Sequence, residues 1–171
     1  WKAWNVLGSH TGTIPVSGGQ LFINEGLITG GQIVMDMKNL QVSDLEGQDK
    51  ADLEAHLRGT TPGKENDFFN TSQYPTATYT ILRSEKLNGD PEATDIIYGS
   101  LQIRDVTKPV NIKVKMDAGA SNAIKITTLP FIIDRTEWGI KFWSKKLTDT
   151  LKENIINDEV QIEFTIGAIA G

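Results

Sequence analysis

The sequence predicts an all-β domain with one short helix, and two features of its pattern support this. About eight runs of residues alternate apolar and polar side chains with the period of two that a half-buried strand requires, and turn signals separate them at the spacing of β-barrels and β-sandwiches. Helical patterns do not alternate with these runs, so a parallel sheet is not expected. A chain of 171 residues fits a single domain over residues 1–171.

The first strand-like segment spans residues 1–16, which include several Trp, Val, Ile and Thr residues. Gly8 and Gly12 interrupt this segment, so we expect one strand that contains a bulge or a bend. The pair Gly18-Gly19 then predicts a turn.

A hairpin is predicted next, from residues 20–24 and 27–37. Glu25-Gly26 lies between the two strands and suits a tight two-residue connection. In the second strand, the apolar side chains at alternate positions should share the inward face, and these are Ile33, Met35 and Met37.

Residues 43–58 predict the helix. Ser43 can cap its N-terminus, and leucines recur on one side with charged residues between them. Residues 59–66 then have the Gly, Pro, Thr and Asn composition of a loop, which leads into the aromatic pair Phe68-Phe69.

Three further strands are predicted over residues 76–83, 95–106 and 110–116. Lys108-Pro109 is expected to break the chain between the last two. Alternation places one set of side chains on the inward faces of these strands: Ala77, Tyr79, Ile81, Ile97, Gly99, Leu101, Ile103, Val110, Ile112, Val114 and Met116.

The last part of the chain is predicted to end in a strand. Residues 124–134 are strand-like with mixed faces, and residues 160–166 alternate clearly. Between them, residues 147–156 carry apolar side chains at four-residue spacing, which indicates one or two helical turns.

Charge and composition exclude several function classes. The net charge is −5, so a nucleic-acid backbone would be repelled. The chain has no Cys, which removes disulfides and thiolate catalysis, and no apolar run approaches the length of a membrane span. Because residue 1 is Trp rather than Met, we interpret the chain as processed or trimmed, so that an export signal or a lipid anchor could have been removed.

An enzyme is not expected. The nearest approach to a nucleophile, base and orienting group is Ser9-His10 with Asp36 or Asp134, but adjacent residues on a strand point to opposite faces. His10 and His56 are the only histidines, and their spacing resembles no known metal-ligand set. We therefore expect no catalytic residue, no metal site and no cofactor.

Several short motifs, in order along residues 1–166, are similar to the YceI-like family. They are Gly8-Ser9-His10-Thr11-Gly12, Gly30-Gly31 with Ile33, Asp36 and Met37, Asp52-Leu53 to His56-Leu57, Asp67-Phe68-Phe69-Asn70, Tyr74-Pro75-Thr76-Ala77-Thr78-Tyr79, Tyr98-Gly99-Ser100-Leu101, Val106-Thr107-Lys108-Pro109-Val110, and Ile133-Asp134-Arg135-Thr136-Glu137-Trp138-Gly139-Ile140. Two departures concern the cavity mouth: residues 60–65 are inserted, and the family's strand portion before Trp1 is absent.

The resemblance implies an eight-stranded antiparallel lipocalin-like barrel with a short helical insertion. It also implies an apolar lipid ligand inside the barrel, which would be a polyisoprenoid, an isoprenoid quinone or a fatty-acyl derivative, and a periplasmic or secreted location. The alternative is a non-enzymatic interaction module whose barrel is filled by side chains. A homodimer is also left open.

The predicted ligand-binding residues are the inward apolar and aromatic side chains of these motifs and strands: Ile33, Met35, Met37, Phe68, Phe69, Tyr74, Tyr79, Ile81, Leu101, Ile103, Val114, Phe131, Trp138, Phe142 and Phe164. Methionines on a buried face are also ordinary core residues, and the aromatic residues can equally dock the helix or close the barrel end. His10 and Arg135 are the candidate head-group contacts, although Arg135 can instead pair with Asp134 or Glu137 in a structural role.

Overall fold

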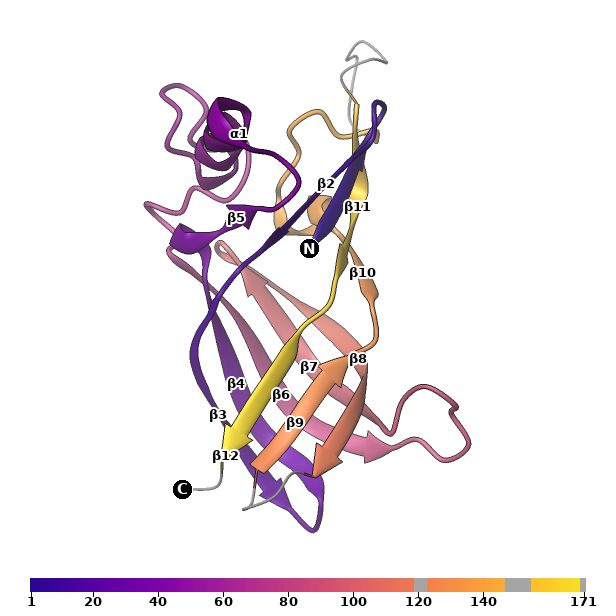
Figure 1. The fold of residues 1–171 in the computed structure, drawn as a ribbon. Helices are drawn as coiled ribbons and strands as arrows, with labels where there is room; N and C mark the ends of the chain where they lie inside the picture. The colour runs from indigo at the N-terminus through magenta and orange to yellow at the C-terminus, as the bar shows by residue number, and fades with distance from the viewer. Residues whose placement is uncertain (119–122, 147–154, 170–171) are drawn as a thin grey trace.

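The computed structural model describes residues 1–118, 123–146 and 155–169. Its strands form a tapering, nearly closed barrel, with one helix and several loops gathered at one end (Figure 1). The helix is α1 (Gly47–Arg58), and two short 3₁₀ helices are η1 (Met37–Asn39) and η2 (Arg135–Trp138). The strands are β1 (Lys2–Asn5), β2 (Ser9–Thr13), β3 (Val16–Asn24), β4 (Leu27–Asp36), β5 (Gln41–Val42), β6 (Thr76–Lys86), β7 (Asp95–Ile103), β8 (Val106–Ala118), β9 (Ala123–Thr128), β10 (Phe131–Asp134), β11 (Ile156–Ile162) and β12 (Thr165–Ile169).

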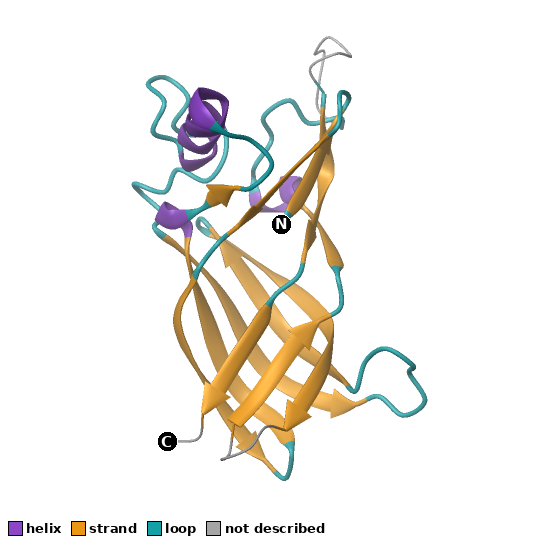
Figure 2. Cartoon of the chain, viewed as in Figure 1, coloured by secondary structure: helices purple, strands orange, loops and turns teal. Residues whose placement is uncertain are grey.

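The strands pair in two antiparallel sheets, in the orders β10-β11-β1-β2-β5 and β12-β9-β8-β7-β6-β4-β3. The chain passes directly from one sheet into the other at β2 to β3, β9 to β10 and β11 to β12, as Figure 2 shows. If each of these three pairs is counted as one bent strand and the two-residue β5 is set aside, eight strands remain in the described part of the chain. The predicted antiparallel barrel with a short helical insertion is therefore confirmed.

The N-terminal strand prediction was wrong in two places. Residues 1–16 form a hairpin and not one bulged strand, because Gly8 lies in a turn that the Asn5 N–H closes by donating to the Gly8 carbonyl at 2.9 Å. Gly18-Gly19 does not form a turn but lies inside β3, next to a register shift. Gly19 has φ of +154°, and a Cβ there would stand 2.3 Å from the Gln32 carbonyl oxygen, so this position requires glycine.

The predicted break at Lys108-Pro109 was also wrong, because Pro109 lies within β8 opposite Ser100 of β7. The partner on the other side of β8 is β9, which pairs only with residues 114–118. Among the described residues, β8 has no strand partner on that side at Pro109, so the missing N–H leaves no ladder partner unsatisfied.

The helix and the C-terminal strand differ from the prediction at their boundaries. The helix α1 begins after Glu46 rather than at Ser43, and it ends at Gly59 in the left-handed conformation. The predicted strand over residues 160–166 is interrupted at Phe164, whose N–H and carbonyl both bind Thr128. Most of the predicted helical turn over residues 147–156 lies outside the described residues.

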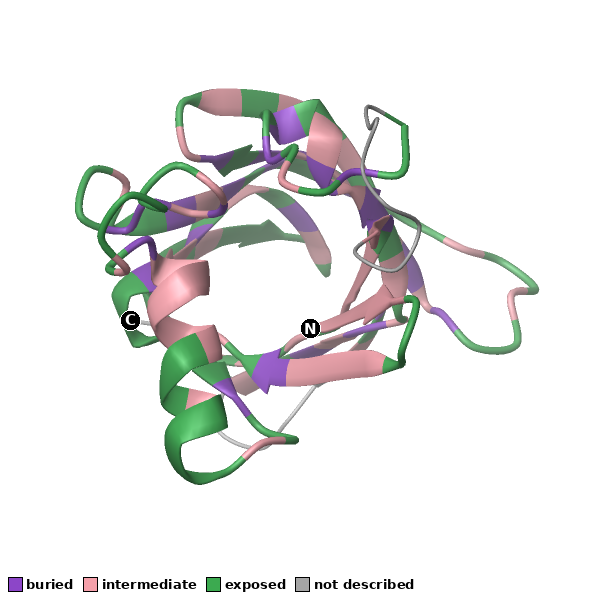
Figure 3. Ribbon diagram, turned by 90° about the horizontal axis from the view of Figure 1, so that it is seen from above, coloured by how far each residue is buried: buried purple, intermediate pink, exposed green. Residues whose placement is uncertain are grey.

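Side chains fill the narrow end of the barrel. Ile28, Ile97, Val114 and Ile126 come from β4, β7, β8 and β9, and each is at most 1% exposed. They belong to one continuous hydrophobic core. The opposite end, seen from above in Figure 3, carries α1. The space left for a site therefore lies between the filled base and the α1 end.

Candidate functional site

An apolar cavity of about 180 Å³ lies inside the α1 half of the barrel. Its wall is built from both sheets, from α1 and from the segment that follows α1. Among the described residues, Arg135 and Glu163 are the only charged side chains on this wall. The cavity therefore offers an almost hydrocarbon-like surface to whatever occupies it.

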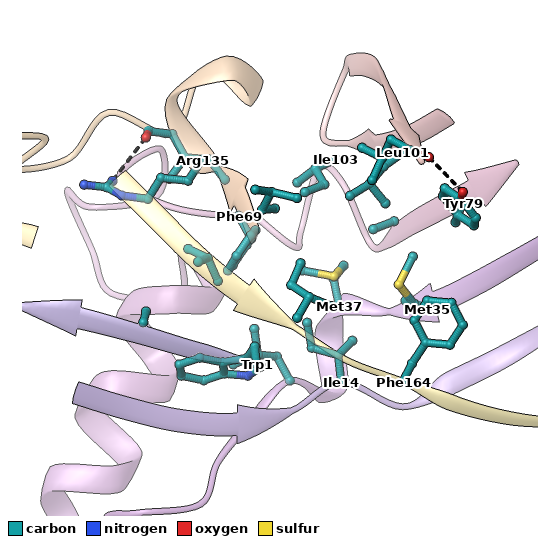
Figure 4. Close-up of a pocket in the computed structure, with 18 of the residues that line it drawn as sticks. Trp1, Ile14, Met35, Met37, Phe69, Tyr79, Leu101, Ile103, Arg135 and Phe164 are labelled. Carbon is teal, nitrogen blue, oxygen red and sulfur yellow. Dashed lines mark hydrogen bonds between the residues drawn. The ribbon is translucent and has the colours of Figure 1, made fainter. Parts of the chain in front are cut away.

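The structure places ten of the fifteen predicted ligand-binding side chains on the cavity wall, and Figure 4 labels several of them. Five of these side chains point inward because of the alternation along β4, β6 and β7, and two phenylalanines come from the short segment after α1. The ten residues are Ile33, Met35, Met37, Phe68, Phe69, Tyr79, Leu101, Ile103, Phe131 and Phe164. Whether they contact a ligand stays a prediction.

Tyr79 is a polar group on this wall, but its hydroxyl is already used. It donates a hydrogen bond to the Val110 carbonyl at 2.8 Å across the barrel wall. Burial raises the pKa of Tyr79 well above its usual range, so the phenol stays neutral at any physiological pH. The residue therefore adds an apolar ring, and no charge, to the cavity.

Arg135 lies on the wall, but its guanidinium is already hydrogen-bonded to other groups of the protein. It is 5% exposed and donates to the carbonyls of Asn157, Ile140 and Ile156 at 3.1 to 3.3 Å, and to the Asp158 carboxylate at 3.4 Å. Burial lowers its pKa, while the Asp158 carboxylate opposes that shift. In Figure 4 its guanidinium points away from the two labelled methionines.

The structural pair predicted for Arg135 exists, but with a different partner. The predicted partners were Asp134 and Glu137, and the structure shows Asp158 of β11 instead. Asp134 is occupied in capping η2, where it accepts hydrogen bonds from the Thr136 N–H and hydroxyl, and it also pairs with Lys146. The guanidinium thus ties η2 to the start of β11.

The helical insertion closes one side of the cavity through aromatic contacts. His56 of α1 binds the Asp67 carboxylate at 2.8 Å, and its ring stands edge-on to Phe68 with centroids 5.0 Å apart. Phe142 packs against the same two rings at 5.0 and 5.4 Å. Both members of the Phe68-Phe69 pair line the cavity, so neither serves only to dock the helix.

A family model described as the YceI-like domain matches residues 2–168. This chain belongs to the YceI-like family. No curated protein matches the chain with significance.

Solved YceI-like structures share the fold at low sequence identity. The Campylobacter jejuni YceI protein is 17% identical with a TM-score of 0.62, over 93% of this chain and 85% of that one. Burkholderia cenocepacia BcnA is 22% identical with a TM-score of 0.62, over 88% and 82%. A polyisoprenoid binding domain from Saccharophagus degradans is 13% identical with a TM-score of 0.59, over 99% and 98%.

Five predicted ligand-binding residues lie off the cavity wall of this YceI-like barrel. Ile81 and Val114 are buried in the hydrophobic core and do not reach the cavity. Tyr74 packs under the Arg104 guanidinium, and the Trp138 indole N–H donates to the Leu101 carbonyl at 3.0 Å. Phe142 stacks on Trp143 and supports Phe68 from behind.

His10 does not reach the cavity either. Its imidazole Nδ1 lies 2.8 Å from the Asp44 carboxylate, which also accepts the Thr11 N–H at 2.7 Å. This pairing joins β2 to the segment before α1. His10 therefore makes a structural contact between these two segments, away from the cavity.

The sequence analysis did not predict much of the cavity wall that the N-terminal and C-terminal strands form. The missed side chains from β1, β2–β3 and β11 are Trp1, Ala3, Ile14, Val16, Ile156, Val160 and Ile162. For Val160 and Ile162 the signal was present, because they share the alternating face of Phe164. For Trp1 and Ala3 no local pattern indicates that β1 is inserted between β2 and β11.

The groups considered for catalysis are not brought together. His10 binds Asp44, Asp36 caps η1 through the Lys38 N–H at 3.0 Å, and Asp134 caps η2. Within residues 1–118, 123–146 and 155–169, no three His, Cys, Asp or Glu side chains are grouped as metal ligands. No helix in the same ranges is long and apolar enough to cross a membrane.

Proposed function

We propose that this YceI-like barrel binds the tail of one long apolar lipid, a polyisoprenoid, an isoprenoid quinone or a fatty-acyl derivative, and carries or stores it without catalysing a reaction. The observation that carries the proposal is the cavity wall, where Arg135 and Glu163 are the only charged side chains among the described residues. The S. degradans structural neighbour, described as a polyisoprenoid binding domain, supports the same ligand class.

The physical basis of binding is the removal of hydrocarbon from water. Each buried CH₂ contributes roughly 0.8 kcal/mol, so an apolar chain needs no polar partner to bind tightly. At about 180 Å³ the cavity is below the roughly 300–1,000 Å³ of typical ligand pockets. Met35 and Met37 are unbranched and adaptable, so we expect them to move when a chain enters.

The head group is expected to remain outside the cavity. The Arg135 guanidinium is already bound to three carbonyls and to Asp158, so it is a poor partner for an added anion. Glu163 is exposed at the wall, and its carboxylate would repel a phosphate. The wall therefore favours an uncharged tail inside, with the polar end of the lipid in solvent.

A series of isoprenoid alcohols of increasing length tests this proposal. The dissociation constant is expected to fall by about fourfold for each CH₂ that enters the cavity, and then to level off once the enclosed length is filled. Quenching of tryptophan fluorescence or calorimetry measures each affinity. A dissociation constant that does not depend on chain length would contradict tail binding.

A filled barrel that acts as an interaction module is the second candidate. The observation that favours it is the small size of the cavity above a base closed by Ile28, Ile97, Val114 and Ile126. In that case the same series of alcohols would show no binding at any length. A periplasmic or secreted location stays a prediction from the family resemblance.

A further inference from the structure

The turn between β1 and β2 carries two apolar side chains that the fold does not need. Leu7 is 91% exposed and Val6 is 52% exposed. Hydrogen bonds hold the turn, in which the Asn5 side-chain oxygen accepts the N–H groups of Leu7 and Gly8, both at 2.9 Å. Polar residues would occupy such a turn at no cost, so a fixed apolar tip is expected to have a partner.

A third exposed apolar side chain, Trp143, is linked to this turn through β11. Its carbonyl accepts the Ile156 N–H at 2.9 Å, and Ile156 pairs with Asn5, the residue just before Val6. Trp143 has φ of +46°, a strained conformation for a residue other than glycine, and its side chain is 41% exposed. We call Val6, Leu7 and Trp143 the end patch.

Within the end patch, Trp143 connects to the cavity wall through aromatic contacts. The Trp143 ring stacks on Phe142 with centroids 4.6 Å apart, and Phe142 packs on Phe68, which lines the cavity wall. In Figure 1 the β1–β2 turn lies at the same end of the barrel as α1, opposite the β3–β4 turn. The patch is thus at the end where the barrel is not filled by side chains.

Two exposed lysines lie beside Trp143 in the sequence. Lys141 and Lys145 flank Trp143 in the sequence and both are exposed, whereas the chain carries a net charge of −5. Exposed aliphatic and indole side chains beside lysines suit the boundary between lipid head groups and acyl chains. Lysines near such a surface are attracted to anionic head groups.

We propose that the end patch docks the barrel on an anionic phospholipid bilayer. Three side chains cannot supply the roughly 800 Å² that each partner contributes to a stable protein interface. They are sufficient for a shallow, reversible insertion into a bilayer. This proposal is independent of the proposed lipid ligand, because membrane binding is measured on vesicles that do not contain it.

Co-sedimentation with vesicles tests the docking surface. The protein is expected to bind vesicles of 70% phosphatidylcholine and 30% phosphatidylglycerol, and Leu7→Asp should weaken that partitioning by about tenfold or more. The double variant Lys141→Gln/Lys145→Gln should lose about fivefold per lysine on these vesicles, and little on pure phosphatidylcholine. Circular dichroism and thermal melts confirm that each variant is folded.

The matched control is Phe22→Asp, which changes an exposed apolar residue (54% exposed) near the β3–β4 turn at the other end of the barrel. We expect this variant to partition like the unmodified protein. The proposal is overturned if the unmodified protein does not bind the anionic vesicles, if Leu7→Asp binds as well as the unmodified protein, or if Phe22→Asp is the variant that loses binding.

Discussion

Met35→Asp is expected to reduce the affinity for an isoprenoid alcohol by at least about 100-fold. Met35 projects from β4 into the cavity, where a carboxylate would have to lose its hydration when the apolar chain enters. The barrel should remain folded, because Met35 is only partly buried. Fluorescence quenching with the longest alcohol of the series measures the loss.

Two variants of the same strand provide the controls. Met35→Leu conserves volume and polarity and should change affinity little. Val34→Asp places the same charge at the preceding residue of β4, which does not line the cavity, and should leave binding intact. If Met35→Asp is folded and binds as well as the unmodified protein, the assignment of this wall is wrong.

Arg135→Met is expected to destabilise the fold by roughly 3–5 kcal/mol. The Asp158 side chain is 5% exposed, and removal of the guanidinium would leave its carboxylate buried without a cation. For a chain of this size the loss corresponds to a fall in Tm on the order of 10 °C. Urea unfolding and calorimetry measure both quantities.

The double variant Arg135→Met/Asp158→Leu removes both charges and should recover most of that stability. Lys146→Met breaks the exposed pair with Asp134 and should cost less than about 1 kcal/mol. A loss below about 1 kcal/mol in Arg135→Met would contradict the structural role. A stable double variant that no longer binds lipid would instead make Arg135 a head-group contact.

Much of the barrel could be predicted because period-two alternation depends only on local chain geometry. Ile33, Tyr79 and Leu101 face inward as their strands predict. Alternation does not encode depth along the barrel axis, however. Ile81 shares the inward face of Tyr79, two residues away on β6, yet it is packed into the core and is not on the cavity wall.

Interactions between distant segments could not be read from local patterns. Asp158 lies 23 residues beyond Arg135, and the two meet only because β10 pairs with β11. The structural partner of His10 is Asp44, which is 34 residues away in the sequence and lies in the segment before α1. A local pattern identifies such polar residues as candidates, while the strand pairing decides what they contact.

The most direct test of the lipid-carrier proposal is native mass spectrometry of the protein purified without denaturation, followed by organic extraction. We predict an added mass in a one-to-one ratio, which the extract identifies as an isoprenoid or fatty-acyl species. If the spectrum shows only the mass of the protein alone, and still does so after incubation with the long isoprenoid alcohols, lipid carriage is contradicted and the filled-barrel interaction module takes its place.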